Sequence, residues 1–181
     1  DLMNELLNEE TIKLLEEISK IIDKIDKEKL KELLDKLYDE NKDLEKELDR
    51  ELELFKQLEF EQKVEETLEK IEALKEEQEQ LKGQTEDKKT DKDVLLEKQE
   101  ELNKKMKEIG KDLEDLRIKN MELEQKNEMP NTKKTEEDIK QNMQESSNAL
   151  KNNKKKKAKK AQEEAIKDMK QLEKQLLSMQ S

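Results

Sequence analysis

The residues of this sequence that could do chemistry are almost all carboxylates and lysines. The chain of 181 residues contains 50 Asp and Glu and 39 Lys and Arg, and it has neither His nor Cys. His is the commonest general base and metal ligand, and Cys would supply a thiolate as nucleophile or zinc ligand. Acid–base catalysis would therefore depend on paired carboxylates, one of them with a pKa raised by burial.

Glu97 and Glu101 are one such pair, because a spacing of four residues places both on one face of a helix. Almost every carboxylate, however, has a Lys three or four residues away, which is typical of a solvated helix surface. A carboxylate-bridged metal site would want Glu-x-x-His pairs, and the two glycines, Gly83 and Gly110, are too far apart to form a phosphate loop. We expect no catalytic residue, no metal ligand and no cofactor, and interpret the chain as a non-enzyme.

Residues 151–160 form the most unusual cluster of charge. The cluster contains seven lysines and no carboxylate: Lys151, Lys154, Lys155, Lys156, Lys157, Lys159 and Lys160. Such a run could bind anionic lipid head groups or another polyanion. It could equally be a solvated helix start, or a patch that pairs with the acidic remainder of the chain. The run lacks Arg and aromatic residues, which argues against bidentate phosphate recognition and base stacking, and so against nucleic acid.

The composition favours long helices packed side by side. Charged residues make up 49% of the chain, hydrophobic residues 30% and aromatic residues 2%, which is too little apolar surface for a large globular core. Lys, Glu, Leu and Gln are good helix formers, whereas a disordered chain would normally be richer in Pro, Gly and Ser. We therefore predict an all-α fold of long coiled-coil helices, in an antiparallel hairpin or an elongated bundle.

The charge is distributed unevenly along the chain. Residues 151–181 contain ten lysines and four carboxylates, a net charge of +6, so that residues 1–150 carry −17 of the total of −11. No apolar run approaches the ~18 residues that cross a bilayer, and no signal peptide is present. Because the chain begins at Asp1 rather than Met, we interpret it as a piece of a longer protein or a processed form.

The first predicted element is a long helix over about residues 1–82, either continuous or broken near Asp26–Glu28. A wide apolar stripe opens it, as expected of a helix with more than one neighbour. The stripe consists of Leu7, Leu14, Leu15, Ile18, Ile21, Ile22 and Ile25, and it continues over Leu30, Leu33, Leu34, Leu37 and Tyr38. A heptad run follows at Phe60, Val64, Thr67, Ile71, Leu74, Gln78 and Leu81. Gly83 is predicted to end the helix, and residues 83–93 to form a polar turn in which Thr90 and Asp93 resemble a capping box.

The second predicted helix, residues 94–129, has the most regular period in the chain. Its seam steps by four and three residues through Leu95, Gln99, Leu102, Met106, Ile109, Leu113, Leu116, Asn120 and Leu123. Asn120 falls at an a position, where a buried Asn can set the register of helix pairing at some cost in stability. The alternative is that Asn120 lies near a fraying end and faces solvent.

Pro130 is predicted to stop this helix, and residues 130–135 to form a turn. A third helical region follows over residues 136–181, with Thr135 and Asp138 as a capping box. It contains a short helix through Ile139, Met143 and Leu150, then the lysine-rich segment 151–160, then a last helix. The apolar face of that last helix holds Ala158, Ala161, Ala165, Ile166, Met169, Leu172, Leu176 and Met179. The three regions could fold back on one another, or partner chains could cover their apolar faces.

Three stretches carry a resemblance to a known family. They are residues 47–64 (ELDRELELFKQLEFEQKV), residues 68–81 (LEKIEALKEEQEQL) and residues 142–165 (NMQESSNALKNNKKKKAKKAQEEA). Together they resemble the helical, coiled-coil region of a family of large, N-terminally membrane-anchored bacterial proteins of unknown function. The resemblance implies an interior, periplasmic segment of a protein of the bacterial cell envelope, although the residues leave the cytoplasm open. It implies no catalytic residue.

These observations favour a structural or interaction module: a scaffold, spacer or docking surface that meets protein partners through coiled-coil faces, within the chain or between chains. The alternative is a peripheral binder of an anionic membrane or another polyanion through residues 151–160. Salt-sensitive binding to anionic liposomes would distinguish the two.

Overall fold

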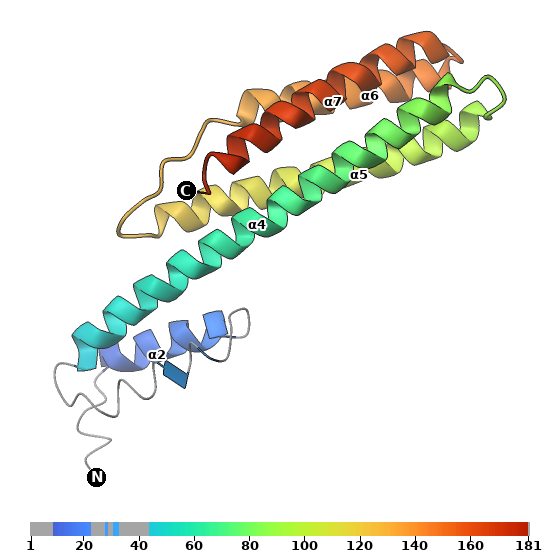
Figure 1. The fold of residues 1–181 in the computed structure, drawn as a ribbon. Helices are drawn as coiled ribbons and strands as arrows, with labels where there is room; N and C mark the ends of the chain where they lie inside the picture. The colour runs from blue at the N-terminus through green and yellow to red at the C-terminus, as the bar shows by residue number, and fades with distance from the viewer. Residues whose placement is uncertain (1–8, 23–27, 29–30, 33–43, 181) are drawn as a thin grey trace. The chain divides into compact units, whose positions relative to one another are not determined.

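The computed structural model describes residues 9–22, 28, 31–32 and 44–180, and within these residues it contains five helices and no strand. The helices are α2 (Glu9–Ile22), α4 (Leu44–Glu86), α5 (Lys92–Met121), α6 (Lys133–Lys151) and α7 (Lys155–Leu177) (Figure 1). The prediction of an all-α bundle is confirmed. The chain divides into two compact units, one of residues 63–118 and 127–181, the other of residues 1–62 and 119–126.

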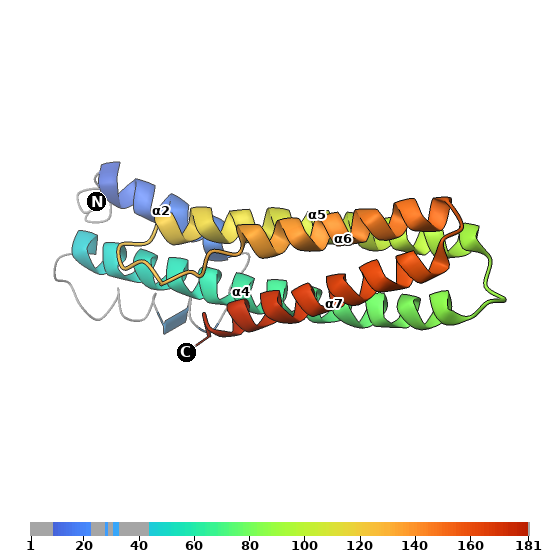
Figure 2. The ribbon, with the colours of Figure 1, turned by 90° about the horizontal axis from the view of Figure 1, so that it is seen from above.

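The larger unit is a four-helix bundle built from the second half of α4, most of α5, and α6 and α7. Figures 1 and 2 show these four segments side by side, with each following its predecessor in the opposite direction. The apolar positions that the heptad pattern singled out form its interior. In α4 the buried positions are Val64, Thr67, Ile71, Leu74, Gln78 and Leu81. In α5 they are Leu95, Gln99, Leu102, Met106, Ile109, Leu113 and Leu116.

The hairpin of α6 and α7 completes this interior. Its buried apolar residues are Ile139, Met143, Ala149, Leu150, Ala158, Ala161, Ala165, Ile166, Met169, Leu172 and Leu176. Every predicted position of the last apolar face is therefore buried except Met179, which is half-buried. Ala residues recur along α7, and small side chains allow neighbouring helices to approach closely. The apolar faces of the bundle are covered from within the same chain.

The smaller unit has its own apolar cluster between α2 and the first part of α4. The cluster consists of Ile18, Ile21, Leu48, Leu52 and Phe55, with Leu58 packed against it. In the predicted stripe of the first helix, Ile18 and Ile21 are buried and Leu15 is 38% exposed, while Leu7 and Ile25 lie outside the described residues. The predicted stripe over Leu30, Leu33, Leu34, Leu37 and Tyr38 lies outside the described residues.

The prediction that Gly83 ends the first helix is wrong, since α4 continues to Glu86. Gly costs ~1 kcal/mol within a helix, but a buried residue two positions later keeps the chain helical. Thr85 is buried there, and its hydroxyl donates a hydrogen bond of 2.8 Å to the carbonyl oxygen of Leu81. The turn is therefore shorter than residues 83–93, and it ends where Asp91, not Thr90, caps α5 by accepting a hydrogen bond from the backbone N–H of Asp93.

Helix α5 ends at Met121, eight residues before the predicted end at 129. Contacts with α4 inside the smaller unit take the place of further helical hydrogen bonds. The backbone N–H of Glu124 donates to the carboxylate of Glu53 at 2.9 Å, and the carbonyl oxygen of Gln125 accepts a hydrogen bond from Gln57 at 3.0 Å. These side chains hold the backbone outside a helix before Pro130 is reached.

The third region begins earlier than predicted, at Lys133, and it contains two helices, as the predicted short helix and last helix indicate. Residue Thr132 precedes α6, and Thr135 is buried within its first turn, so the proposed Thr135–Asp138 capping box is wrong. A Schellman-type turn then separates α6 from α7. The backbone N–H of Lys154 donates to the carbonyl oxygen of Ala149, that of Asn153 donates to Leu150, and Asn153 has a left-handed φ of 56°. Asn tolerates this conformation better than most residues.

Candidate functional site

The lysine-rich segment lies across the turn between α6 and α7. Lys151 is the last residue of α6, Lys154 precedes α7, and the other five lysines occupy the first two turns of α7. Lys155 and Lys159 are half-buried, whereas the remaining five are exposed. The segment is therefore not one continuous helix start, because the chain reverses direction within it.

The turn between α4 and α5 lies directly beside this reversal. Lys155 Nζ donates to the carbonyl oxygen of Thr90 at 2.6 Å and to that of Asp87 at 3.4 Å. Lys92 Nζ donates in the other direction, to the carbonyl oxygen of Lys151 at 3.3 Å. Figures 1 and 2 show both turns at the same end of the bundle. Backbone carbonyls therefore accept all three of these hydrogen bonds between the two turns.

This arrangement adds Lys88 and Lys89 to the lysines of residues 151–160. We name six exposed lysines at this end the lysine tip: Lys88, Lys89, Lys151, Lys154, Lys156 and Lys157. Residues 86–93 contain three lysines and four carboxylates, and residues 151–160 contain seven lysines and no carboxylate, so the two segments together have a net charge of +6. None of the six tip lysines forms an ion pair with a residue that the structure describes.

Three of the four carboxylates of residues 86–93 already have a partner. Asp87 accepts a hydrogen bond from the backbone N–H of Lys89, and Asp91 caps α5. Glu86 pairs with Lys159 at 3.1 Å. The interpretation of residues 151–160 as a patch that complements the acidic remainder therefore fits Lys159, but it does not fit the exposed lysines around it.

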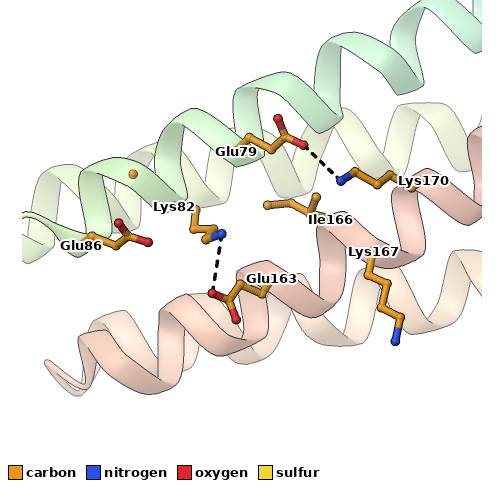
Figure 3. Close-up of a pocket in the computed structure, with 8 residues that line it drawn as sticks. Glu79, Lys82, Glu86, Glu163, Ile166, Lys167 and Lys170 are labelled. Carbon is orange, nitrogen blue, oxygen red and sulfur yellow. Dashed lines mark ion pairs between the residues drawn. The ribbon is translucent and has the colours of Figure 1, made fainter.

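An antiparallel ladder of ion pairs continues from Lys159 along α4 and α7. Lys82 pairs with Glu163 at 3.6 Å, Glu79 with Lys170 at 3.9 Å, and Lys75 with Glu173 at 2.7 Å. Figure 3 shows two of these pairs across a groove between the helices, where Ile166 lies between them and Lys167 points away. Gly83 borders the same groove, where a Cβ atom would meet no heavy atom within 4 Å. The groove is lined by paired charges of both signs, so it selects no ligand of a particular charge.

A buried polar layer crosses the bundle close to the lysine tip. It consists of one residue from each helix, namely Gln78, Gln99, Ser146 and Gln162, and all four are 0% exposed. The amides of Gln78 and Gln99 donate to one another's oxygens at 3.0 and 2.9 Å. Gln99 Oε1 also accepts from Ser146 at 2.9 Å, and Gln162 donates to Ser146 at 3.0 Å. Gln162 Oε1 is buried without a hydrogen-bond partner among the described residues, whereas the other bonds of the layer favour a single alignment of the helices.

Sequence reasoning placed Gln78 and Gln99 in the two seams, but it did not identify the layer. The available signal was a Gln at an inward position of each of two predicted helices. Ser146 and Gln162 gave no comparable signal, because their burial depends on how α6 and α7 dock. Asn103 extends the layer toward α6 by donating to Ser147 at 2.9 Å.

Asn120 is 8% exposed, although α5 ends at the next residue. The alternative in which it faces solvent is therefore wrong. Leu123, the last position of the predicted seam, is also buried. Whether Asn120 sets the register stays a prediction.

The paired carboxylates Glu97 and Glu101 are both exposed. They lack the burial through which a carboxyl group becomes an acid catalyst at neutral pH. In the part of the chain that the structure describes, no group of three or more carboxylates is arranged to hold a metal ion. No described helix is both long enough and apolar enough to cross a membrane.

Comparison with known proteins adds no relative: no family model, no curated protein and no solved structure matches the chain. The fold and the placement of its polar and charged residues define a class, an all-α helical bundle with a buried polar layer and a lysine-rich end.

Proposed function

We propose that this chain is a non-catalytic structural and interaction module, which acts as a scaffold, spacer or docking surface within a larger protein of the bacterial cell envelope. The observation that carries the proposal is the division of side chains within the bundle. Its apolar stripes are buried against one another, and charged side chains occupy the outside of all four helices. Such a bundle is suited to holding a fixed length and presenting charged faces to protein partners.

Photo-crosslinking in the native cells tests this proposal. A photoreactive residue is placed in turn at Glu76 of α4, Lys107 of α5, Gln144 of α6 and Gln171 of α7, each of which is exposed. We expect adducts with a discrete macromolecule from one or two of the four faces. The absence of macromolecular adducts from all four faces, in cells that contain the folded protein, would contradict the docking and scaffold function.

The second candidate function is peripheral binding of an anionic membrane or another polyanion. The specific observation in its favour is that the six tip lysines are exposed and have no carboxylate partner among the described residues. Sedimentation with anionic liposomes at low and high salt tests it, since binding through exposed lysines weakens as salt screens the charges.

A further inference from the structure

We infer that the lysine tip docks end-on against the surface of an anionic lipid bilayer. This inference deepens the second proposed function: it assigns the binding surface to two turns rather than to residues 151–160 alone, and it assigns the direction of approach.

The first step is that the lysine tip is formed by two turns, which hydrogen bonds hold next to one another. Lys88 and Lys89 are separated from Lys154 by more than sixty residues in the sequence, yet the bonds from Lys155 to Thr90 and from Lys92 to Lys151 join their turns. Six flexible ammonium groups therefore project from one end of a packed bundle. Lysines close to an anionic membrane contribute about 1 kcal/mol each, so a group of this size is sufficient for measurable binding at low salt.

The second step is that Lys154, Lys156 and Lys157 do not help the fold, whereas Lys151, in the last turn of α6, is favourably placed in the helix dipole. The first turn of α7 contains no acidic residue, and Lys154 before it makes no side-chain cap hydrogen bond. Positive charges at the start of a helix oppose the helix dipole, and each costs roughly 0.3–1 kcal/mol at low salt. An anionic surface in contact with this end would offset that cost.

The third step concerns orientation. Residues 1–150 carry a net charge of −17, and carboxylates recur along the exposed faces of α4 and α5. An anionic bilayer repels those faces and attracts only the end where residues 151–160 meet the α4–α5 turn. The charge distribution therefore favours an orientation in which the helices of the bundle point away from the membrane surface.

A bilayer fits this end better than a nucleic acid. The tip consists of two adjacent turns, so it presents an end rather than a groove that could follow a sugar–phosphate backbone. It contains no Arg for bidentate phosphate contacts and no aromatic side chain on which a base could stack. Lysines act as dispersed point charges, which is sufficient for lipid head groups in a fluid surface.

The test is co-sedimentation of the full chain with vesicles of pure phosphatidylcholine and of phosphatidylcholine with about one third phosphatidylglycerol, at low and high salt. The tip variant changes Lys151, Lys154, Lys156 and Lys157 to Gln. The matched control changes four exposed lysines elsewhere to Gln, namely Lys104, Lys107, Lys111 and Lys140. Both variants remove four positive charges, so they separate a specific surface from overall charge.

We expect the unmodified chain to bind the anionic vesicles alone, with binding lost at high salt. The tip variant should bind on the order of 100-fold more weakly, while the control keeps more than a third of the affinity. Circular dichroism should show both variants folded, with the tip variant melting at the same temperature as the unmodified chain or higher. Equal weakening by the two variants, or no vesicle binding by the unmodified chain, would overturn the inference. Tighter binding to a single-stranded oligonucleotide than to the anionic vesicles would overturn it in favour of nucleic acid.

Orientation is tested separately by energy transfer, because the chain contains no Cys and a single one can be introduced. A fluorophore is attached at Lys89→Cys in the tip or at Lys133→Cys at the start of α6, with an acceptor on the lipid head groups. End-on docking predicts clearly higher transfer from position 89, and equal transfer from the two positions would overturn it. Crosslinks to protein at the four bundle faces, together with no vesicle binding, would leave the scaffold function standing and refute only the lipid surface.

Discussion

Charged groups along the sides of the bundle have partners of opposite charge, whereas, in the part of the chain that the structure describes, the lysines at its end do not. Asp112 accepts hydrogen bonds from Lys63 at 3.1 Å and Lys70 at 2.8 Å, and Arg117 donates to Glu114 and Glu136. At the lysine tip, by contrast, six lysines have no carboxylate partner among the described residues. The ion-paired side chains contribute to one alignment of the helices. Removal of the tip lysines, in contrast, should change the stability of the fold little. Whether a charged side chain has a partner within the chain thus distinguishes residues that stabilise the bundle from residues that are available to bind another molecule.

The largest expected effect comes from breaking the buried polar layer with Gln99→Ala. The substitution removes the acceptor of Gln78 and Ser146 and leaves buried polar groups without partners, each at about 1–3 kcal/mol. We expect a loss of about 3–5 kcal/mol in the free energy of unfolding, measured by urea denaturation. Glu100→Ala, at the exposed neighbouring position, should change stability by less than about 0.5 kcal/mol. A loss below about 1 kcal/mol for Gln99→Ala would show that the layer does not form.

Arg117→Ala tests the paired charges directly. Glu136 has a side chain that is 8% exposed, and among the described residues it would keep only the hydroxyl of Thr132 as a side-chain partner. We expect a loss of about 2 kcal/mol, because hydrogen bonds between charged groups are worth ~1.5–3 kcal/mol. Lys111→Ala, at an exposed position of the same helix, is the control, and similar melting temperatures for the two variants would contradict the assignment.

The substitution Asn120→Leu tests whether a buried amide outside the four-residue layer also sets the alignment of the helices. An apolar residue at this a position should raise the free energy of unfolding by about 1 kcal/mol and loosen the register or the choice of partner. Thermal melting and sedimentation equilibrium measure the two effects. If both the melting temperature and the oligomeric state stayed unchanged, Asn120 would have no role in setting the register.

The contributions of Asp112 and Asp168 to the stability of the bundle depend on pH in opposite directions. Burial opposes ionisation of Asp112, but the hydrogen bonds from Lys70 and Lys63 outweigh it and lower its pKa. Its contribution to stability is therefore present above the ordinary pKa of Asp and lost as pH falls through the lowered value. Burial raises the pKa of Asp168, against the hydrogen bond from Asn142, so its contribution is lost as pH rises through the raised value.

Asp112→Asn should therefore destabilise the bundle at pH 7, and the difference from the unmodified chain should shrink toward pH 3. Asp168→Asn should stabilise it at pH 7 by less than about 1 kcal/mol, with no gain at pH 3. Urea denaturation between pH 3 and pH 7 measures both differences. Curves with the same sign for the two variants would refute the contrast.

The smallest expected effect is at the lysine tip. Lys156→Glu and Lys157→Glu each place a carboxylate in the first turn of α7, so each should raise the free energy of unfolding by roughly 0.3–1 kcal/mol at low salt. The gain should fade at about 1 M salt, where charges are screened within ~3 Å. Lys107→Glu, in the middle of α5, should give no such gain. A loss of stability from the tip substitutions would mean that these lysines do support the fold.

The period of the apolar residues determined the faces of the helices from sequence alone. All nine positions from Leu95 to Leu123 in the predicted seam are buried, as are all seven from Phe60 to Leu81. The reason is local: a helix of 3.6 residues per turn brings residues three and four apart onto one face, whatever lies opposite. The all-α class and the antiparallel reversals followed from the same pattern and from the gaps in it.

Only the tertiary structure decided where helices end and which polar residues meet. Local preferences at helix ends amount to only about 1 kcal/mol, so tertiary contacts outweigh them. The burial of Thr85 accompanies the continuation of α4 past Gly83, and the side chains of Glu53 and Gln57 bind the backbone that follows α5. The contact of Lys155 with Thr90 joins residues 65 positions apart. No local spacing encodes such a contact, because it exists only once two hairpins have docked through their apolar faces.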